Sequence, residues 1–203
     1  RTSEVCETIL DFKMDFSYES NKEKALNNVI GSISKGQCVV LCGESGCGKS
    51  TFLRCLNHLI PEFYDGIFNG HILVNSENIC NKNVGEVGEI ISSVFQDPRS
   101  QFFTMESDTE ISFGLENKGL THEEIKKRTK EAFSKFGLEY LENIEVFKLS
   151  SGERQLIAVM AAWAMNTEII LLDEPTANLD YLAIEKLKNI LLLLKEEGKT
   201  LII

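Results

Sequence analysis

Short apolar runs separated by turn-forming residues recur along the chain and predict the strands of a buried sheet. These runs cover 37–42, 90–95, 169–172 and 200–203. Two other stretches, 4–16 and 66–80, alternate more loosely between apolar and polar positions, as expected of antiparallel strands. The pattern therefore predicts two kinds of sheet: a buried core sheet and an antiparallel one near the start of the chain.

Helical spacing of apolar residues predicts the helices. Residues 49–59 are expected to form a helix directly after a turn. Over 121–136, apolar side chains fall on one helix face, and Thr121 and Glu124 have the spacing of a capping box. The whole segment 97–160 is therefore predicted to be a mostly helical insertion.

Composition narrows the class of protein. The 203 residues are 43% hydrophobic and 26% charged, which is typical of a folded globular domain. The net charge of −10 disfavours a general nucleic-acid surface, because a polyanion is held mainly by clustered lysines and arginines. No apolar run reaches the roughly 18 residues of a membrane-spanning helix.

A glycine-rich loop between the predicted strand 37–42 and the predicted helix 49–59 carries the first candidate chemistry. The loop and the residues that follow it are Gly43, Glu44, Ser45, Gly46, Cys47, Gly48, Lys49, Ser50 and Thr51. Gly43 and Gly48 are expected to take backbone angles that a side chain forbids, so that N–H groups converge on a phosphate at a helix start. Lys49 can reach the β- and γ-phosphates of ATP, and the Ser50 hydroxyl can bind Mg²⁺. The alternative is a purely structural glycine turn.

Two adjacent carboxylates, Asp173 and Glu174, follow the apolar run 169–172. Carboxylates at the end of a buried strand are costly unless they meet a cation or a reactive water molecule. We expect Asp173 to hold Mg²⁺, mostly through water, and Glu174 to orient and deprotonate the attacking water. The alternative is a strand that simply ends at an acidic helix cap.

The heptad 149–155, Leu-Ser-Ser-Gly-Glu-Arg-Gln, has the pattern of a helix start, with Ser150 as the cap and Glu153 completing a capping box. The heptad lies between the glycine loop and the acidic pair. In this order of motifs the chain resembles the ATP-binding cassette (ABC) ATPases, which carry a Leu-Ser-Gly-Gly-Gln type signature at the same place. In this chain Ser151 stands in place of the first glycine and Glu153 in place of the glutamine, whereas Ser150 and Gly152 match the signature.

The resemblance implies an α/β fold of the P-loop NTPase (RecA-like) class. Its expected parts are a parallel-sheet core, an antiparallel β subdomain and an inserted α-helical subdomain. We expect one domain over 1–203, with 1–96 and 161–203 forming the core and β subdomain. The helical signature subdomain would then occupy 97–160.

The resemblance also assigns roles to residues outside the glycine loop. Gln96 matches the glutamine that binds the site's Mg²⁺, assists catalysis and contacts the transporter, and Tyr18 matches an aromatic that stacks on adenine. Ser150, Gly152 and Asp180 would serve the ATP of a second ABC ATPase domain, since two such domains sandwich two nucleotides. A homodimer and a heterodimer both remain open, and so does a second ATPase domain in a longer parent chain.

Three segments, 57–66, 95–103 and 111–117, resemble the energy-coupling factor (ECF) importers of vitamins and metal ions. This implies an integral membrane transporter subunit as partner and a location on the cytoplasmic face of the membrane. The apolar pair Phe102-Phe103 would then contact that subunit, or else fill the helical core. The alternative class is a soluble ABC ATPase that acts on nucleic acid or ribosomes. A motor domain does not touch the transported substrate, so the sequence does not identify it.

One expected family residue has no match. The switch histidine should follow the strand 200–203, and His58, His71 and His122 lie elsewhere. We therefore expect this sequence to be a C-terminally truncated piece that binds nucleotide but hydrolyses it slowly. The six cysteines lack paired spacing and are expected to be reduced, with Cys47 a reactive thiol in the glycine loop.

Overall fold

The computed structural model describes residues 7–20 and 23–203, and in these residues it contains two sheets with helices packed around them. The antiparallel sheet has the order β2-β1-β4-β5, formed by Leu26–Ser34, Thr8–Tyr18, Gly66–Val74 and Glu77–Asn78. The second sheet has the order β3-β8-β7-β6, formed by Cys38–Val39, Thr200–Ile202, Ile169–Leu172 and Ile91–Val94. All its neighbouring strands are parallel, as the apolar runs predict.

The first predicted strand of the core sheet is shorter and more exposed than expected. Only Cys38 and Val39 form β3, although a hydrogen bond from the Leu41 N–H to the Ile203 carbonyl continues the pairing. Val40 is 61% exposed. The prediction of a buried strand over 37–42 is therefore wrong, because β3 lies at the edge of the described sheet and pairs only with β8.

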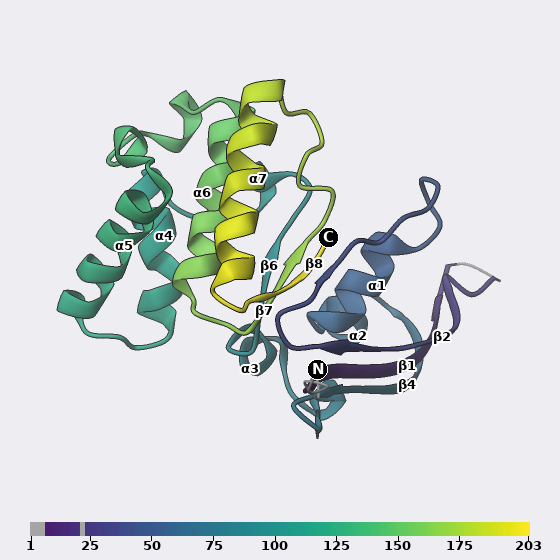
Figure 1. Cartoon of the computed structure of the whole chain (residues 1–203). Helices are drawn as coiled ribbons and strands as arrows, with labels where there is room; N and C mark the ends of the chain where they lie inside the picture. Colours follow the sequence, from purple (N-terminus) through teal and green to yellow (C-terminus); the bar gives the residue numbers. More distant parts are fainter. Residues whose placement is uncertain (1–6, 21–22) are drawn as a thin grey trace, which may run out of the picture.

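The helices fall into groups (Figure 1). Beside the antiparallel sheet lie α1 (Lys49–Leu56) and α2 (Leu59–Glu62), and α3 (Val84–Gly88) leads into β6. At the opposite end lie α4 (Ser107–Asn117) and α5 (His122–Phe136), packed against α6 (Ser151–Ala164) and followed by α7 (Tyr181–Glu196). The α/β class with an antiparallel sheet and a helical part is thus confirmed. No helix in the described part of the chain is long and apolar enough to cross a membrane.

The start of α5 agrees with the prediction, whereas the end of the helix after the glycine loop does not. The capping box of α5 is present as expected, with the Thr121 and Glu124 side chains each bonded to the other's backbone. The predicted helix 49–59 instead ends at Leu56, because His58 takes a left-handed backbone conformation. His58 is therefore not in a helix. In addition, α6 runs through the predicted subdomain boundary at 160 to Ala164.

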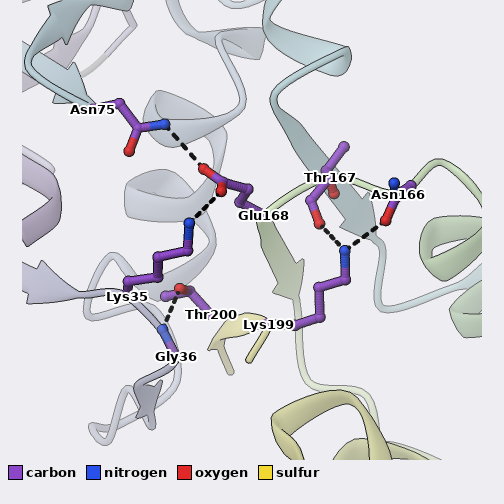
Figure 2. Close-up of polar contacts among 8 residues, drawn as sticks. All are labelled: Lys35, Gly36, Asn75, Asn166, Thr167, Glu168, Lys199 and Thr200. Carbon is purple, nitrogen blue, oxygen red and sulfur yellow. Dashed lines mark hydrogen bonds and ion pairs between the residues drawn. The ribbon is translucent and has the colours of Figure 1, made fainter. Parts of the chain in front are cut away.

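The two sheets are joined by a polar cluster at the end of the core sheet where β7 and β8 begin (Figure 2). Glu168 precedes β7 and binds two side chains that follow strands of the antiparallel sheet. Lys35 Nζ lies 2.6 Å from Glu168 Oε1, and Asn75 Nδ2 donates to Glu168 Oε2 at 3.0 Å. These partners hold the pKa of Glu168 below its usual value, Lys35 being the larger cause. We call Lys35, Asn75 and Glu168 the sheet clamp.

Backbone contacts reinforce the same junction. The Gly36 N–H donates to Thr200 Oγ1 at 3.0 Å, and Lys199 Nζ donates to the Thr167 carbonyl at 2.8 Å (Figure 2). The antiparallel sheet is thus attached to the starts of β7 and β8, and the opposite ends of these strands are left for the site.

Candidate nucleotide-binding site

The glycine loop joins β3 to α1 as predicted, but its glycines serve different purposes. Gly46 and Gly48 take left-handed angles, with φ of 81° and 103°. Gly43 does not, which contradicts the expectation that it needs a glycine-only angle. Gly43 is small for another reason: a Cβ there would lie 2.6 Å from Cys47 Sγ. The loop therefore folds tightly enough that its first glycine contacts its cysteine.

Lys49 is the first residue of α1 and turns back over the loop. Its Nζ donates to the carbonyls of Gly43 and Glu44, both at 3.0 Å. The ammonium group is thereby held above the N–H groups of the loop, at the positive end of the helix dipole. Exchanging these carbonyl partners for phosphate oxygens would require only a local movement of the lysine side chain.

A hydroxyl and a carboxylate meet beside Lys49. Ser50 Oγ, in the first turn of α1, donates to Asp173 Oδ1 at 3.0 Å, and Asp173 directly follows β7. The structure thus brings together the two oxygen donors that the sequence predicts for Mg²⁺. Oxygen ligands of this kind suit a hard divalent cation.

Glu174 adopts a left-handed backbone conformation, with φ of 44°, which costs a residue with a Cβ about 1 kcal/mol. Its exposed carboxylate accepts a hydrogen bond from Gln96 Nε2 at 2.9 Å. Gln96 follows β6, the neighbour of β7, so that the carboxyl ends of two adjacent strands supply this pair. The two predicted catalytic side chains therefore contact each other directly.

These segments surround one cleft of 430 Å³. Among its lining residues are Tyr18, Ser45, Lys49, Ser50, Gln96 and Glu174. Tyr18 comes from the antiparallel sheet, where its hydroxyl lies 3.0 Å from Thr51 Oγ1 and its ring packs edge-on against Phe16. An aromatic wall, a phosphate-binding loop and acidic groups thus border the same space.

The signature heptad begins α6 with the predicted capping box. Ser150 Oγ accepts the Glu153 N–H, and the Glu153 carboxylate accepts the Ser150 N–H. Asp180 caps α7 by accepting the Ala183 N–H at 2.8 Å. Gly152 is buried against α7, where an added Cβ would lie 2.5 Å from the Cβ of Ala183.

Ser150, Gly152 and Asp180 are absent from the lining of the 430 Å³ cleft. The exposed Ser150 and Asp180 instead lie at the adjacent starts of α6 and α7. The role of these three residues toward a second nucleotide stays a prediction.

A second depression, of 300 Å³, shares no lining residue with the first. We call it the lateral groove; its lining includes Leu59, Phe95, Gln101, Phe103, Glu110 and Met165. Phe102 and Phe103 were predicted either to contact a membrane subunit or to fill the helical core, and the two side chains differ in environment. Phe102 packs against the core of the helical part, whereas Phe103 is 75% exposed and stacks on Phe113.

Sequence reasoning missed three polar side chains around the site. Lys24 lines the 430 Å³ cleft and pairs with Asp15 at 2.7 Å. Gln101 and Glu110 hold the loop that starts at Gln96. Of the three, only Gln101 is visible in the sequence, as a second glutamine shortly after Gln96. Its role depends on hydrogen bonds to the backbone of Ser93 and Phe95, which residue spacing does not predict.

The loop, the Ser50–Asp173 pair and the Gln96–Glu174 pair together have the arrangement of a P-loop nucleotide-binding site. Comparison with known proteins identifies the family. The family model described as "ABC transporter" matches residues 26–177, which is most of the chain. The chain belongs to the ABC transporter family.

Individual relatives support the assignment to the ABC transporter family. A putative ABC transporter ATP-binding protein of Treponema denticola is 41% identical over 190 residues, covering 94% of this chain and 39% of the relative. The putative HMP/thiamine import ATP-binding protein YkoD of Bacillus subtilis is 37% identical over 169 residues, covering 83% of this chain and 31% of YkoD. The chain thus spans less than two fifths of the length of these relatives.

A solved structure shows the same fold. CbiO1 of Clostridium perfringens, described as part of the ABC transporter complex cbiONQ, matches with a TM-score of 0.82 and 30% identity. The match covers 97% of this chain and 77% of CbiO1.

Proposed function

We propose that this chain is the ATP-binding and ATP-hydrolysing domain that powers a membrane importer of the ECF type, which takes up a vitamin or a metal ion. The observation that carries the proposal is the hydrogen bond between Gln96 and Glu174. It joins the loop beside the lateral groove to the carboxylate expected to activate water. A partner seated in the groove would therefore act on the reaction through Gln96. The import role described for YkoD and the transporter complex described for CbiO1 support the same proposal.

ATP would bind with adenine against Tyr18 and its phosphates over residues 43–51. Lys49 would leave the carbonyls of Gly43 and Glu44 for the β- and γ-phosphates. Ser50 and Asp173 would hold Mg²⁺, and Gln96 would be a further oxygen donor to it. When bound, Mg²⁺ neutralises negative charge on the phosphate oxygens.

Glu174 would accept a proton from the attacking water. The hydrogen bond from Gln96 ends on Glu174 Oε2, so Oε1 can contact that water while Gln96 holds the carboxylate in place. Ser150, Gly152 and Asp180 of a second ABC ATPase domain would complete the site from the opposite face. We propose that the complex lies on the cytoplasmic face of the membrane, with a membrane subunit in the lateral groove.

Two measurements on the intact protein test the proposal. ATP hydrolysis should require Mg²⁺ and should fall at least about a hundredfold in Glu174→Gln, because the group that positions and activates water is lost. Solubilised membranes should yield the protein together with an integral membrane subunit. Co-purification with ribosomes or nucleic acid instead would overturn the importer assignment, although the ATPase assignment would stand.

A further inference from the structure

The loop that carries Gln96 is held by a side chain that does not line the nucleotide cleft. Gln101 Oε1 accepts the Phe95 N–H at 3.1 Å, and Gln101 Nε2 donates to the Ser93 carbonyl at 3.2 Å. These backbone groups lie at the end of β6, immediately before Gln96. Gln101 lines the lateral groove, on the other side of the loop from the nucleotide.

The two hydrogen bonds act like a short additional strand pairing. A carboxamide offers one acceptor and a donor side by side, and here both bind the backbone of a single strand end. They close residues 93–101 into a ring and hold the peptides on both sides of Val94. The strand end from which Gln96 leaves is held in place as a result.

The far end of the same loop is attached to the helical part of the molecule. Glu110, in α4, is 6% exposed, and its Oε2 accepts the N–H groups of Phe103 and Thr104 at 3.0 and 2.9 Å. The Thr104 hydroxyl donates to the same oxygen at 2.9 Å. Residues 101–104 are therefore bonded to β6 through Gln101 and to α4 through Glu110.

We propose that Gln101 is a positioning residue for ATP hydrolysis: it sets the backbone from which Gln96 reaches Glu174. This inference rests on the proposed ATPase function and adds to it a residue that contacts neither nucleotide nor reacting water. Gln96 meets Glu174 at 2.9 Å, and a displacement of its backbone by about 1 Å would break that contact. Loss of Gln101 should therefore lower the rate of the chemical step more than the affinity for ATP.

The test compares Gln101→Met with wild type in the intact protein. Methionine keeps the length of the side chain and removes both hydrogen bonds. We expect kcat for ATP hydrolysis to fall about tenfold or more, because small misplacements of a catalytic group are costly. The KM for ATP and the melting temperature should stay close to wild type, since residues 43–51 and the core are untouched.

Two further variants separate positioning from a general loss of structure. Gln37→Met is the matched control: Gln37 also accepts a backbone N–H, that of Ser34 at 2.8 Å, but at the junction between β2 and β3. It should keep wild-type kcat. Gln101→Glu keeps an acceptor for the Phe95 N–H but turns a carboxylate oxygen toward the Ser93 carbonyl, so its kcat should fall at least as far as that of Gln101→Met.

The outcomes are distinct. Absence of ATPase activity in the wild-type protein would overturn the proposed function and this inference with it. Wild-type kcat in a folded Gln101→Met protein would overturn this inference alone. A fall in kcat that matches a fall in melting temperature in both Gln101 variants would show a merely structural role and overturn the inference.

Discussion

At the scale of single residues, Gly152 fixes the distance between two helices. A Cβ at this position would lie 2.5 Å from the Cβ of Ala183, so α6 and α7 approach too closely for any side chain. We expect Gly152→Ala to lower the free energy of unfolding by about 1–3 kcal/mol, the usual cost of overpacking. Urea unfolding of the purified variant measures this change.

The double variant Gly152→Ala with Ala183→Gly provides the control. It removes the opposing methyl group and should recover most of the loss, less about 1 kcal/mol for glycine in a helix. Equal stability of the single and double variants would show that another contact is responsible.

Cys47 offers a chemical test of the glycine loop. Its thiol is exposed, so iodoacetamide should modify it and block ATP binding, and bound ATP should slow the reaction. Cys55 is an internal control, because burial raises the pKa of its thiol to about 12. Peptide mass spectrometry distinguishes these cysteines from Cys38 and Cys42. A labelling rate at Cys47 that is unchanged by ATP would contradict its assignment to the phosphate-binding loop.

The glycine-loop motif predicted the placement of Lys49 and Ser50, because one strand–loop–helix unit holds both. Asp173 reaches Ser50 from the end of a separate strand, β7, and the family resemblance pointed to Gln96 and Tyr18. The motif gave the wrong reason for Gly43, because the contact with Cys47 Sγ depends on how the loop closes in space. Glu110 escaped prediction because a buried carboxylate with three loop donors has no periodic signature.

At the scale of secondary-structure elements, the start of α6 has both a structural and a predicted functional role, and substitutions at Ser150 can separate them. Aspartate caps a helix about as well as serine, whereas alanine costs about 1 kcal/mol. We expect Ser150→Asp to melt like wild type and Ser150→Ala to be less stable. Thermal unfolding monitored by circular dichroism measures both.

The sheet clamp predicts a pH dependence of stability. The pKa of Glu168 is lowered in the folded state, so its ion pair stabilises the fold above the unfolded pKa of about 4.3 and loses this effect as the pH falls. Glu168→Gln should therefore be less stable than wild type at pH 7, by at most about 1 kcal/mol because water screens the pair. The difference should shrink below about pH 4.

Urea unfolding at several pH values measures the effect of the clamp. Glu145→Gln is the control, because the side-chain ion pair of Glu145 with Lys148 lies within one turn of chain and does not link separate elements. A Glu168→Gln deficit that persists unchanged at low pH would mean that the loss arises from packing rather than charge.

Whether a segment forms a helix or a strand was easier to predict than where that helix or strand begins and ends. The run 169–172, made only of isoleucine and leucine, became a fully buried central strand, whereas the less apolar run 37–42 became a two-residue edge strand. The two strands also differ in the number of neighbouring strands, which local sequence does not encode. The helix ending at Leu56 depends likewise on the left-handed turn at His58.

At the scale of the whole molecule, the residues proposed to contact nucleotide lie on two separate faces of the chain. A complete site would therefore combine one face of this chain with the other face of a second domain. The cleft holds Lys49, Gln96 and Glu174, while Ser150 lies outside it at the start of α6. A second copy or a related domain would bring the missing face. We expect Glu174→Gln in the intact protein to form a stable dimer with ATP and Mg²⁺, because ATP binds but is not hydrolysed. Light scattering coupled to size-exclusion chromatography measures the mass.

Ser150→Asp combined with Glu174→Gln makes this test specific to the proposed geometry. The aspartate keeps the helix cap but puts a negative charge where the γ-phosphate of the partner's ATP should approach. This double variant should bind ATP as tightly as Glu174→Gln and remain a monomer. A dimer of the double variant would show that Ser150 does not face the second nucleotide. A monomer of Glu174→Gln itself, with ATP bound, would rule out the ATP-dependent pairing of two such chains.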